Sequence, residues 1–563
     1  MVRFVNASAS TATPSGPPSE ESLRPEESGP SRLYFGLAVF LCCLATWIIK
    51  TVVNAPRTGV NHGDISFYVT VARNLAEGRG FVIDYIWNFW SHPEGIPTPS
   101  NLWWMPMASI IGAAGMKVFG TTDYGAAQSA MILFTSLTPL VTYLLARELF
   151  GRPIGLAGAV LATSFHLFLD QPSAPLSHGP FLVFSTLTLW LICKSMDRPF
   201  LLLFTGMGIA LTHLSRTDGL LLVGSLAAAW LIARVRPTTK HLLLLVLGYA
   251  LVMSPWWARN LQDFDTIQPG GSSRAVFLRD YEAWYSLPES VTAETYLQDG
   301  WSPVIDRKVS VGRNNLGSLA TGMTSGANQR KRVWDHPFIV GLMILSWIGL
   351  LSCSRRRFGF LWAHAALLWL FYSLVFTAVG TESFRTGMYS LYPFLLACSA
   401  KGLQTVTGFL TRRPSASSAD MPGPLFWACL LLLSIGQFSY AKSSLVIKSE
   451  GIDRLNLTYR DLKTEVLEPL GLLDATFMAR DVHELHATLG VRCVQIPYEE
   501  EPAIREVAQR YGVTHILLMG EHIQQARPAL AKIDEDPRYE RVAGPFLIRG
   551  TPLQIYAIRN DSP

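Results

Sequence analysis

The sequence predicts a multi-span α-helical membrane protein, with about 11 transmembrane helices and a small extracytoplasmic α/β domain at its C-terminal end. Two observations predict this class. Of the 563 residues, 49% are apolar and only 16% are charged, and the mean hydropathy is +0.25, a balance that one soluble core of this length does not accommodate. Apolar stretches also recur along most of the chain, before short alternating strand and helix patterns begin.

Each apolar stretch has roughly 17–24 residues, enough to cross a hydrocarbon core of about 30 Å. We expect these spans at residues 33–53, 126–146, 153–169, 178–193, 199–215, 217–233, 241–258, 337–353, 358–379, 387–410 and 424–440. Segment 102–119 is a further candidate, interrupted by Pro106, Gly112 and Gly115, so counts of about 12 or 13 are the alternative.

The distribution of basic residues decides how segment 102–119 is interpreted. If it does not cross the bilayer, all the basic loops fall on the side of the N-terminus, which the positive-inside rule identifies as the cytoplasm. These loops contain Arg147 and Arg152, Lys194 and Arg198, Arg234, Arg236 and Lys240, Arg355 to Arg357, and Arg412 and Arg413. We therefore expect 102–119 to be an interfacial or re-entrant element.

This topology divides the chain into three parts. Residues 1–31, rich in Ser, Pro and Glu, are expected to be a disordered cytoplasmic tail. Residues 32–445 form the transmembrane part, with outer loops at 54–125 and 259–336, and residues 446–563 form the extracytoplasmic α/β domain. Its strand patterns cover 476–480, 493–496 and 515–519. The first span lacks a small-residue cleavage site, so we expect an uncleaved anchor in a plasma membrane, the inner membrane of a bacterium.

Charge and cysteine usage exclude other classes. The formal net charge of +5 is modest and most basic residues lie in short loops between spans, so no nucleic-acid partner is expected. Of the seven cysteines only Cys493 lies in a soluble segment, so the spacing indicates neither a disulfide framework nor a zinc site.

The stretch just after the first span carries the best functional lead. Asp64 begins a predicted helix whose apolar positions share one face, as expected for a helix that lies along the membrane surface. These positions are Ile65, Tyr68, Val69, Ala72 and Leu75. Asp64 could act only as an N-cap for backbone N–H groups. At the bilayer edge it could instead deprotonate an acceptor hydroxyl while the membrane presents a lipid-borne sugar.

Several short motifs follow one another in a specific order. They are Asp64 with Tyr68, the run 72–81, Pro97 and Pro99 before Leu102 and Trp103, and the segments 146–151, 214–219, 255–260, 480–481 and 511–513. Together they resemble the GT-C superfamily of membrane glycosyltransferases, family-39-like enzymes that include protein O-mannosyltransferases and the lipid A aminoarabinose transferase. The resemblance implies a GT-C-like fold and inverting transfer of a sugar from a polyprenyl-phosphate donor, with Asp64 as general base.

Transfer from a phosphate ester needs a base for the acceptor and cations for the leaving phosphate, but no strong general acid. The residues expected to bind the donor phosphate are Tyr68, Arg216, Arg259 and Arg385. Each arginine lies at the outer end of a predicted span, where a guanidinium can bind phosphate. Each could equally reach towards lipid headgroups or form a structural ion pair, as Arg216 could with Asp218.

Asp170, in a short outer loop, is a second catalytic candidate, because a like charge near Asp64 would make one carboxylate a stronger base. A solvated loop aspartate is the alternative. The chemistry requires no cofactor. A divalent metal is nevertheless an open possibility, with His62, His92, Glu94 and His178 as ligands, although their spacing matches no dedicated helical motif.

Aromatic residues gather in the first outer loop and could stack against a sugar or form an interfacial belt. They are Tyr85, Trp87, Phe89, Trp90, Trp103 and Trp104. The outer loop 259–336 could hold a segment that closes over the substrate.

The expected function is therefore sugar transfer from a polyprenyl-phosphate donor to a glycan, lipid or protein acceptor, in contact with membrane lipid. A catalytically silent lipid-sugar binding or assembly subunit would retain the same groove. A secondary transporter is a third class, disfavoured because the charged residues gather at the outer rim rather than at the bilayer midplane.

Overall fold

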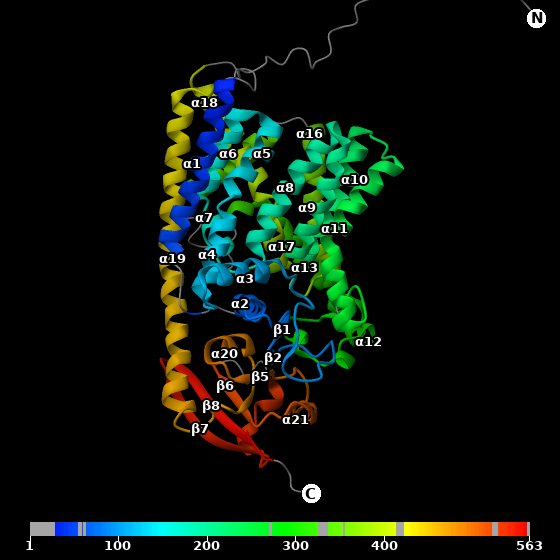
Figure 1. Ribbon diagram of the computed structural model, residues 1–563, viewed down its shortest axis with the longest axis vertical. Helices are drawn as coiled ribbons and strands as arrows, with labels where there is room; N and C mark the ends of the chain where they lie inside the picture. The colour runs from blue at the N-terminus through cyan, green and yellow to red at the C-terminus, as the bar shows by residue number, and fades with distance from the viewer. Residues whose placement is uncertain are drawn as a thin grey trace, which may run out of the picture.

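The computed structural model describes residues 29–54, 59, 63–269, 273–324, 336–352, 355–412, 421–520 and 527–559. A bundle of long helices occupies most of the long axis, and a sheet with short helices lies at one end (Figure 1). Helices α2 (Gly63–Ala76) and α3 (Met107–Phe119) lie between the bundle and the sheet.

The helices of the bundle follow one another with short connections. They are α1 (Gly29–Asn54), α4 (Tyr124–Thr135), α5 (Thr138–Phe150), α6 (Arg152–Ser164), α7 (His166–Leu169), α8 (His178–Asp197), α9 (Leu202–Ser215), α10 (Leu221–Ala233), α11 (Thr239–Phe264), α15 (Pro337–Leu351), α16 (Arg355–Leu370), α17 (Gly380–Gly387), α18 (Tyr392–Leu410) and α19 (Pro424–Asp461). Several begin with proline in the first turn, as α5 does with Pro139 and α18 with Pro393, where the missing N–H needs no helical partner.

Six helices in the described ranges are long and apolar enough to cross a membrane. A seventh span results if α6 and the segment His166–Ser173, which are bent by 54°, are taken together. Shorter apolar helices add α3, Pro199–Ser215, Thr217–Ala233 and α15. Every one of the predicted apolar stretches is helical over most of its length. A mainly helical membrane protein with a small sheet region is therefore confirmed, whereas the count of about 11 spans stays a prediction.

Within segment 102–119, residues Met107–Phe119 form helix α3, which packs closely against α2 and α4. A Cβ atom on Gly112 would lie 3.1 Å from that of Ala72 in α2, and one on Gly115 would lie 2.6 Å from the Ala126 carbonyl oxygen in α4. The glycines that interrupt the apolar pattern are thus the points where neighbouring helices approach closely. The hydroxyl of Ser109 also donates to the Tyr68 carbonyl oxygen at 3.0 Å.

The sheet has the strand order β2-β5-β4-β6-β8-β7. Its strands are β2 (Tyr85–Ile86), β4 (Thr476–Ala479), β5 (Arg492–Gln495), β6 (His515–Met519), β7 (Tyr539–Ile548) and β8 (Thr551–Ile558). Strands β4, β5 and β6 run parallel and coincide with the strand patterns of the sequence, and the hairpin β7–β8 joins antiparallel to β6. Helices α20 (Val482–Leu489) and α21 (Glu501–Arg510) connect the parallel strands.

The first outer loop is part of this sheet. Strand β2 pairs in parallel with β5, with Tyr85 opposite Cys493, while a small ribbon of β1 (Val82–Ile83) and β3 (Thr98–Pro99) lies beside it. One continuous apolar core joins α2, α3 and the sheet, with Phe67, Tyr85 and Phe477 fully buried in it. We call the part of the chain from β4 to β8 the tail. Helices α12 (Ala293–Leu297) and α13 (Trp301–Ala320) of the second outer loop lie beside the bundle and the tail (Figure 1).

Candidate active site between the bundle and the tail

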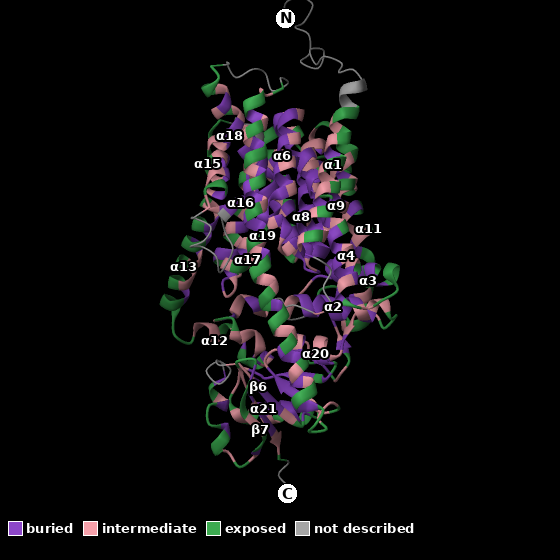
Figure 2. Ribbon diagram, turned by 90° about the vertical axis from the view of Figure 1, so that its left-hand side faces the viewer, coloured by how far each residue is buried: buried purple, intermediate pink, exposed green. Residues whose placement is uncertain are grey.

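Helix α2 is enclosed rather than lying along an open surface. Its apolar residues Ile65 and Val69 are buried, and the polar Ser66, Thr70 and Asn74 are also only 0–1% exposed. The polar face is covered because α3 packs on one side of α2 and α20 of the tail on the other (Figure 2). The expectation of an exposed polar face, as on a surface-lying amphipathic helix, is therefore wrong.

Asp64 lies half-buried in the first turn of α2, at the junction of the bundle, the second outer loop and the tail. Burial is the main reason that the pKa of Tyr68 lies above its ordinary value, and the Asp64 carboxylate raises it further. A hydrogen bond with Ser177 and the charge of Arg216 act in the opposite direction. Burial, and to a smaller extent Asp64, likewise raises the pKa of Tyr281 from the second outer loop. Tyr68 thus interacts with both a carboxylate and a guanidinium.

Glu484 of α20 is a second acidic group at this junction. The Gly63 N–H donates a hydrogen bond to the Glu484 carboxylate, so a tail residue caps the first turn of α2. Burial, followed by the charge of Asp481, raises the pKa of Glu484 to about 8, and Asp64 contributes in the same direction. Burial also raises the pKa of Asp481.

Arg216 lies where α9 ends and a 3-10 turn, Thr217–Leu220, begins. Its Nε donates to Asp218 Oδ1 at 3.0 Å, and its Nη2 donates to the Tyr372 hydroxyl at 2.9 Å. The guanidinium also lies over the ring of Phe181, 5.5 Å from its centroid. The ion pair with Asp218, foreseen as the structural alternative, is therefore present, and it holds Arg216 where its charge acts on Tyr68.

Arg385 lies on α17, with its side chain 11% exposed. Its Nη1 donates to Glu382 at 2.7 Å, while its Nε is buried and has no hydrogen-bond partner in the described part of the chain. Gly387, two residues further on, reaches the Arg216 site: a Cβ there would lie 3.3 Å from Asp218 Oδ2. The guanidinium of Arg385 thus retains a buried donor near Arg216.

Asp170 follows α7 and forms an ion pair with Lys448 of α19 at 2.6 Å. Glu484 is a like-charge neighbour of Asp64, because α20 of the tail folds back against the start of α2. A catalytic role for Asp170 stays a prediction.

Arg259 lies in the last turns of α11 and binds the first outer loop. Its Nη2 donates to the carbonyl oxygens of Phe81 at 3.1 Å and Ser100 at 2.8 Å, and its Nε lies 2.7 Å from Asp263. The structure brings Arg216 to Tyr68, but no described contact brings Arg259 there.

The residues considered for a metal site do not form a cluster in the described ranges. His92 and Glu94 are exposed, and His178 is hydrogen-bonded to Thr386 at 3.2 Å. His62 lies outside the described residues. Among the described residues, no group of three or more His, Cys, Asp or Glu side chains is arranged to hold a metal ion.

The aromatic residues of the first outer loop pack against one another and the tail. Trp87 stacks on Trp104 with 4.6 Å between ring centroids, and Trp90 stacks on Trp284 of the second outer loop at 5.2 Å. Tyr85 is hydrogen-bonded to His483 of α20 at 2.9 Å. This cluster joins the two outer loops to the tail, and Tyr85, Trp87, Phe89 and Trp90 are buried in that contact.

The second outer loop docks on the tail through Glu282. Its carboxylate accepts hydrogen bonds from Arg480 at 2.8 Å and from Arg527 at 2.5 Å. Arg527 is 1% exposed and its guanidinium lies between the rings of Tyr285 and Tyr498. The described part of this loop is therefore held over the Asp64 junction.

Sequence reasoning missed Tyr281, Glu484 and Tyr372 as members of the site. Each lies far along the chain from Asp64 in a segment without a recognisable motif. The one local signal was the spacing of Asp481 and Glu484, two carboxylates three residues apart in the first turn of a short helix, where acidic residues ordinarily serve as caps.

Comparison with known proteins agrees with this fold. A family model described as dolichyl-phosphate-mannose-protein mannosyltransferase matches residues 95–258. No curated protein matches the chain in sequence. ArnT from Cupriavidus metallidurans, solved bound to undecaprenyl phosphate, matches with a TM-score of 0.55 and 13% identity, over 92% of this chain and 97% of its own.

Two archaeal structures show the same likeness. The Archaeoglobus fulgidus oligosaccharyltransferase in its apo form matches with a TM-score of 0.54 and 13% identity, over 92% of this chain and 74% of its own. The oligosaccharyltransferase AglB of that organism, in complex with an inhibitory peptide and a dolichol-phosphate, matches with a TM-score of 0.50 and 13% identity, over 95% and 75%. The resemblance predicted from the sequence is confirmed: the chain is a membrane protein with the fold of the GT-C glycosyltransferase superfamily.

Proposed function

We propose that the protein transfers a sugar from a polyprenyl-phosphate donor to an acceptor at the outer face of the membrane. The observation that carries the proposal is that a half-buried carboxylate, Asp64, and a guanidinium, Arg216, come from distant segments and both act electrostatically on one buried phenol, Tyr68. Transfer from a phosphate ester requires such a base and such a cation close together.

The identity of the lipid carrier is supported by the similar structures. ArnT was solved with undecaprenyl phosphate and AglB with a dolichol-phosphate, both polyprenyl phosphates. We assign the same class of lipid to the donor of this chain. The acceptor is a hydroxyl or amine of a glycan, lipid or protein.

In the proposed mechanism Asp64 accepts the proton of the acceptor as the acceptor attacks the anomeric carbon. Attack comes from the face opposite the phosphate, so the configuration of the sugar inverts. The bond to the phosphate oxygen breaks, and the lipid phosphate leaves as an anion. A phosphate is a good leaving group, so no second, protonated carboxyl is needed, unlike in glycoside hydrolysis.

Three side chains stabilise the leaving phosphate in this proposal. Arg216 and the buried Nε of Arg385 supply positive charge and donors. Burial keeps the pKa of Tyr68 above its ordinary value, so its hydroxyl stays protonated and can donate a hydrogen bond. Arg259 does not contact the donor in this proposal; it supports the site by holding the first outer loop. Asp170 holds the turn before α8 in place through its ion pair with Lys448.

The test is sugar transfer by the purified protein in nanodiscs, with radiolabelled polyprenyl-phosphate sugars as donors and cell-envelope extract as acceptor. The native chain should form labelled product. Asp64→Asn should lower the rate about 100- to 10,000-fold while donor binding is retained, because the variant keeps the shape of the side chain but loses the base. Asp306→Asn is the matched control, since Asp306 is exposed on α13 and has no described contact with α2.

The outcomes separate the candidate functions. Equal product from the native chain and Asp64→Asn would remove Asp64 from the mechanism. Donor binding without product from either chain, across all acceptor fractions, would favour the silent binding or assembly subunit. If the protein neither binds the donor nor transfers a sugar, the secondary transporter is the remaining candidate class.

A further inference from the structure

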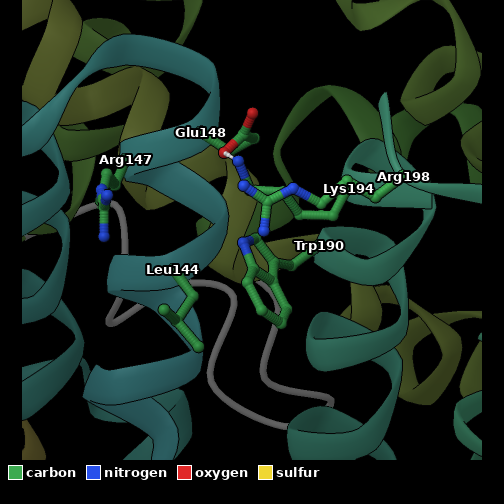
Figure 3. A pocket seen from close by; sticks show the side chains of 6 residues that line it. All are labelled: Leu144, Arg147, Glu148, Trp190, Lys194 and Arg198. Atoms are coloured by element: carbon green, nitrogen blue, oxygen red, sulfur yellow. Dashed lines mark ion pairs between the residues drawn. The ribbon is translucent and has the colours of Figure 1, made fainter. Parts of the chain in front are cut away.

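A cavity lies between α5 and α8 at the end of the bundle away from the sheet. Its volume is about 260 Å³, and it is lined by Leu144, Arg147, Glu148, Trp190, Lys194 and Arg198 (Figure 3). Leu144 and Glu148 lie four residues apart on α5. Trp190 and Lys194 on α8 and Arg198 just past its end are also spaced by four residues. Each helix therefore presents one face to the cavity.

The lining carries an excess of positive charge. Lys194 forms an ion pair with Glu148 at 2.6 Å. Arg147 and Arg198 are exposed, and no carboxylate among the described residues forms an ion pair with either. Two guanidinium groups are thus available to an anion, and guanidinium groups bind phosphate through paired hydrogen bonds.

An adjoining cavity extends this basic region around α5. Its volume is about 320 Å³, and it is lined by Phe35, Tyr143, Arg147 and Arg152. Arg147 lines both cavities, so its guanidinium lies between them, and it is hydrogen-bonded to the Tyr143 hydroxyl. The lining of this second cavity includes no acidic residue.

An exposed apolar row leads along the bundle to the first cavity. Leu133 at the end of α4, Leu137 just before α5 and Leu140 on α5 are exposed and lie three or four residues apart along the span Tyr124–Phe150, and Leu144, four residues further on, lines the cavity. A free anion would gain nothing from this row, whereas an acyl chain would bury apolar surface against it. The cavity is also smaller than the ~300–1,000 Å³ of a typical drug-sized site, so it suits a headgroup rather than a whole lipid.

We propose that this cavity binds the phosphate of an anionic phospholipid from the leaflet on the predicted cytoplasmic side. Arg198 contacts the phosphate inside the cavity, and Arg147, whose side chain points to the other side of α5 in Figure 3, adds a second basic group beside the headgroup. Trp190 lies at the headgroup level, and the leucine row contacts one acyl chain. The site lies at the opposite end of the bundle from Asp64. It therefore does not depend on the proposed glycosyl transfer.

The experiment is native mass spectrometry of the full chain in detergent, equilibrated with equal amounts of phosphatidylglycerol and phosphatidylcholine of the same acyl length. The native chain should retain phosphatidylglycerol preferentially. Arg147→Gln with Arg198→Gln should lower that preference about tenfold or more, because two basic groups near the anionic headgroup are lost. Arg198→Gln alone, a change at an exposed position past the end of α8, should give a smaller loss and serves if the double variant does not fold.

The matched control is Arg236→Gln with Lys240→Gln, which removes two exposed charges from another predicted cytoplasmic loop. It should keep the native preference. Equal loss in the control would overturn the proposal, because general surface charge would then explain the binding. An unchanged preference in the cavity variants would also overturn it. Displacement of the lipid by millimolar glycerol phosphate would reveal a site for a free anion instead.

Discussion

Arg385 offers a clean test of donor-phosphate binding at the scale of one residue. Its partner Glu382 is 64% exposed, so Arg385→Gln leaves that carboxylate in water and should cost only about 0–1 kcal/mol of stability. Loss of a charge-assisted hydrogen bond to phosphate should raise the Kd for polyprenyl phosphate about 10- to 100-fold. Titration calorimetry of polyprenyl phosphate against the protein in nanodiscs measures the Kd of the native chain and of the variant.

Arg313→Gln removes the same charge from an exposed position on α13 and should leave the Kd unchanged. If Arg385→Gln binds polyprenyl phosphate with the same Kd as the native chain, Arg385 is not part of the phosphate site. Arg216→Gln is a poorer probe, because Asp218 is only 2% exposed and would lose its ion pair. Removing one partner of a buried pair costs about 3–5 kcal/mol, so lost binding there would not distinguish function from folding.

Individual residues also show where prediction from sequence succeeds. Asp64 stands directly before an apolar periodicity, a local pattern that places it at a helix N-terminus, and α2 begins there. The partners of Asp64 are different. Tyr281 and Glu484 reach it only because two distant segments fold over α2, and no local pattern encodes such long-range contacts.

At the scale of elements, α2 shows the limit of periodicity. The spacing of apolar residues predicts a helix with one apolar face, which is correct. Whether the other face meets water depends on α3 and on α20, which comes from the far end of the chain; both pack on α2, and Ser66 and Thr70 are buried. Strand β2 has only two residues, too few for an alternating pattern, so its place in the sheet could not be predicted.

The contact of α20 with α2 predicts a pH dependence of stability. The pKa of Glu484 is raised from 4.5 to about 8 in the folded protein, so the folded state binds more protons than the unfolded state between these values. The contribution of Glu484 to stability is therefore fully present below about pH 4.5 and falls as the pH rises towards 8. Each pKa unit corresponds to about 1.4 kcal/mol, so the total change is a few kcal/mol at most.

Glu484→Gln should remove this slope, because glutamine stays neutral and its side-chain oxygen can still accept the Gly63 N–H. Thermal unfolding between about pH 5 and pH 8 should show the native chain losing stability and the variant changing less. Glu540→Gln is the control, since Glu540 forms an exposed ion pair with Arg559. If the stability of the native chain and that of Glu484→Gln depend on pH in the same way, protonation of Glu484 is not linked to folding.

On the scale of the whole molecule, composition and the order of motifs predict the class, and the fold comparison agrees. How the loops and the tail pack together could not be predicted from the sequence. The tail shares its sheet and its apolar core with the first outer loop, and Glu282 connects the second outer loop to Arg480 and Arg527. These contacts join segments from three regions, so the site forms only in the complete chain.

The orientation of the molecule gives the last prediction. The basic loops predict that the bundle end with the α10–α11 connection, which contains Val235, faces the cytoplasm. The sheet lies at the other end of the long axis, and Lys532 lies in the connection between its strands β6 and β7. Val235 and Lys532 are both exposed. In right-side-out membrane vesicles a membrane-impermeant maleimide should label Lys532→Cys directly, and Val235→Cys only after detergent is added.

The parent chain sets the background, because the described native cysteines are buried or half-buried. Labelling of both variants without detergent would mean that the two positions lie on the same side, so the predicted topology would be wrong. If only Val235→Cys is labelled without detergent, the molecule has the opposite orientation in the membrane, and Asp64 lies on the cytoplasmic side. A lipid-linked donor would then have to be presented from the inner leaflet, since α2 lies at the sheet end of the bundle.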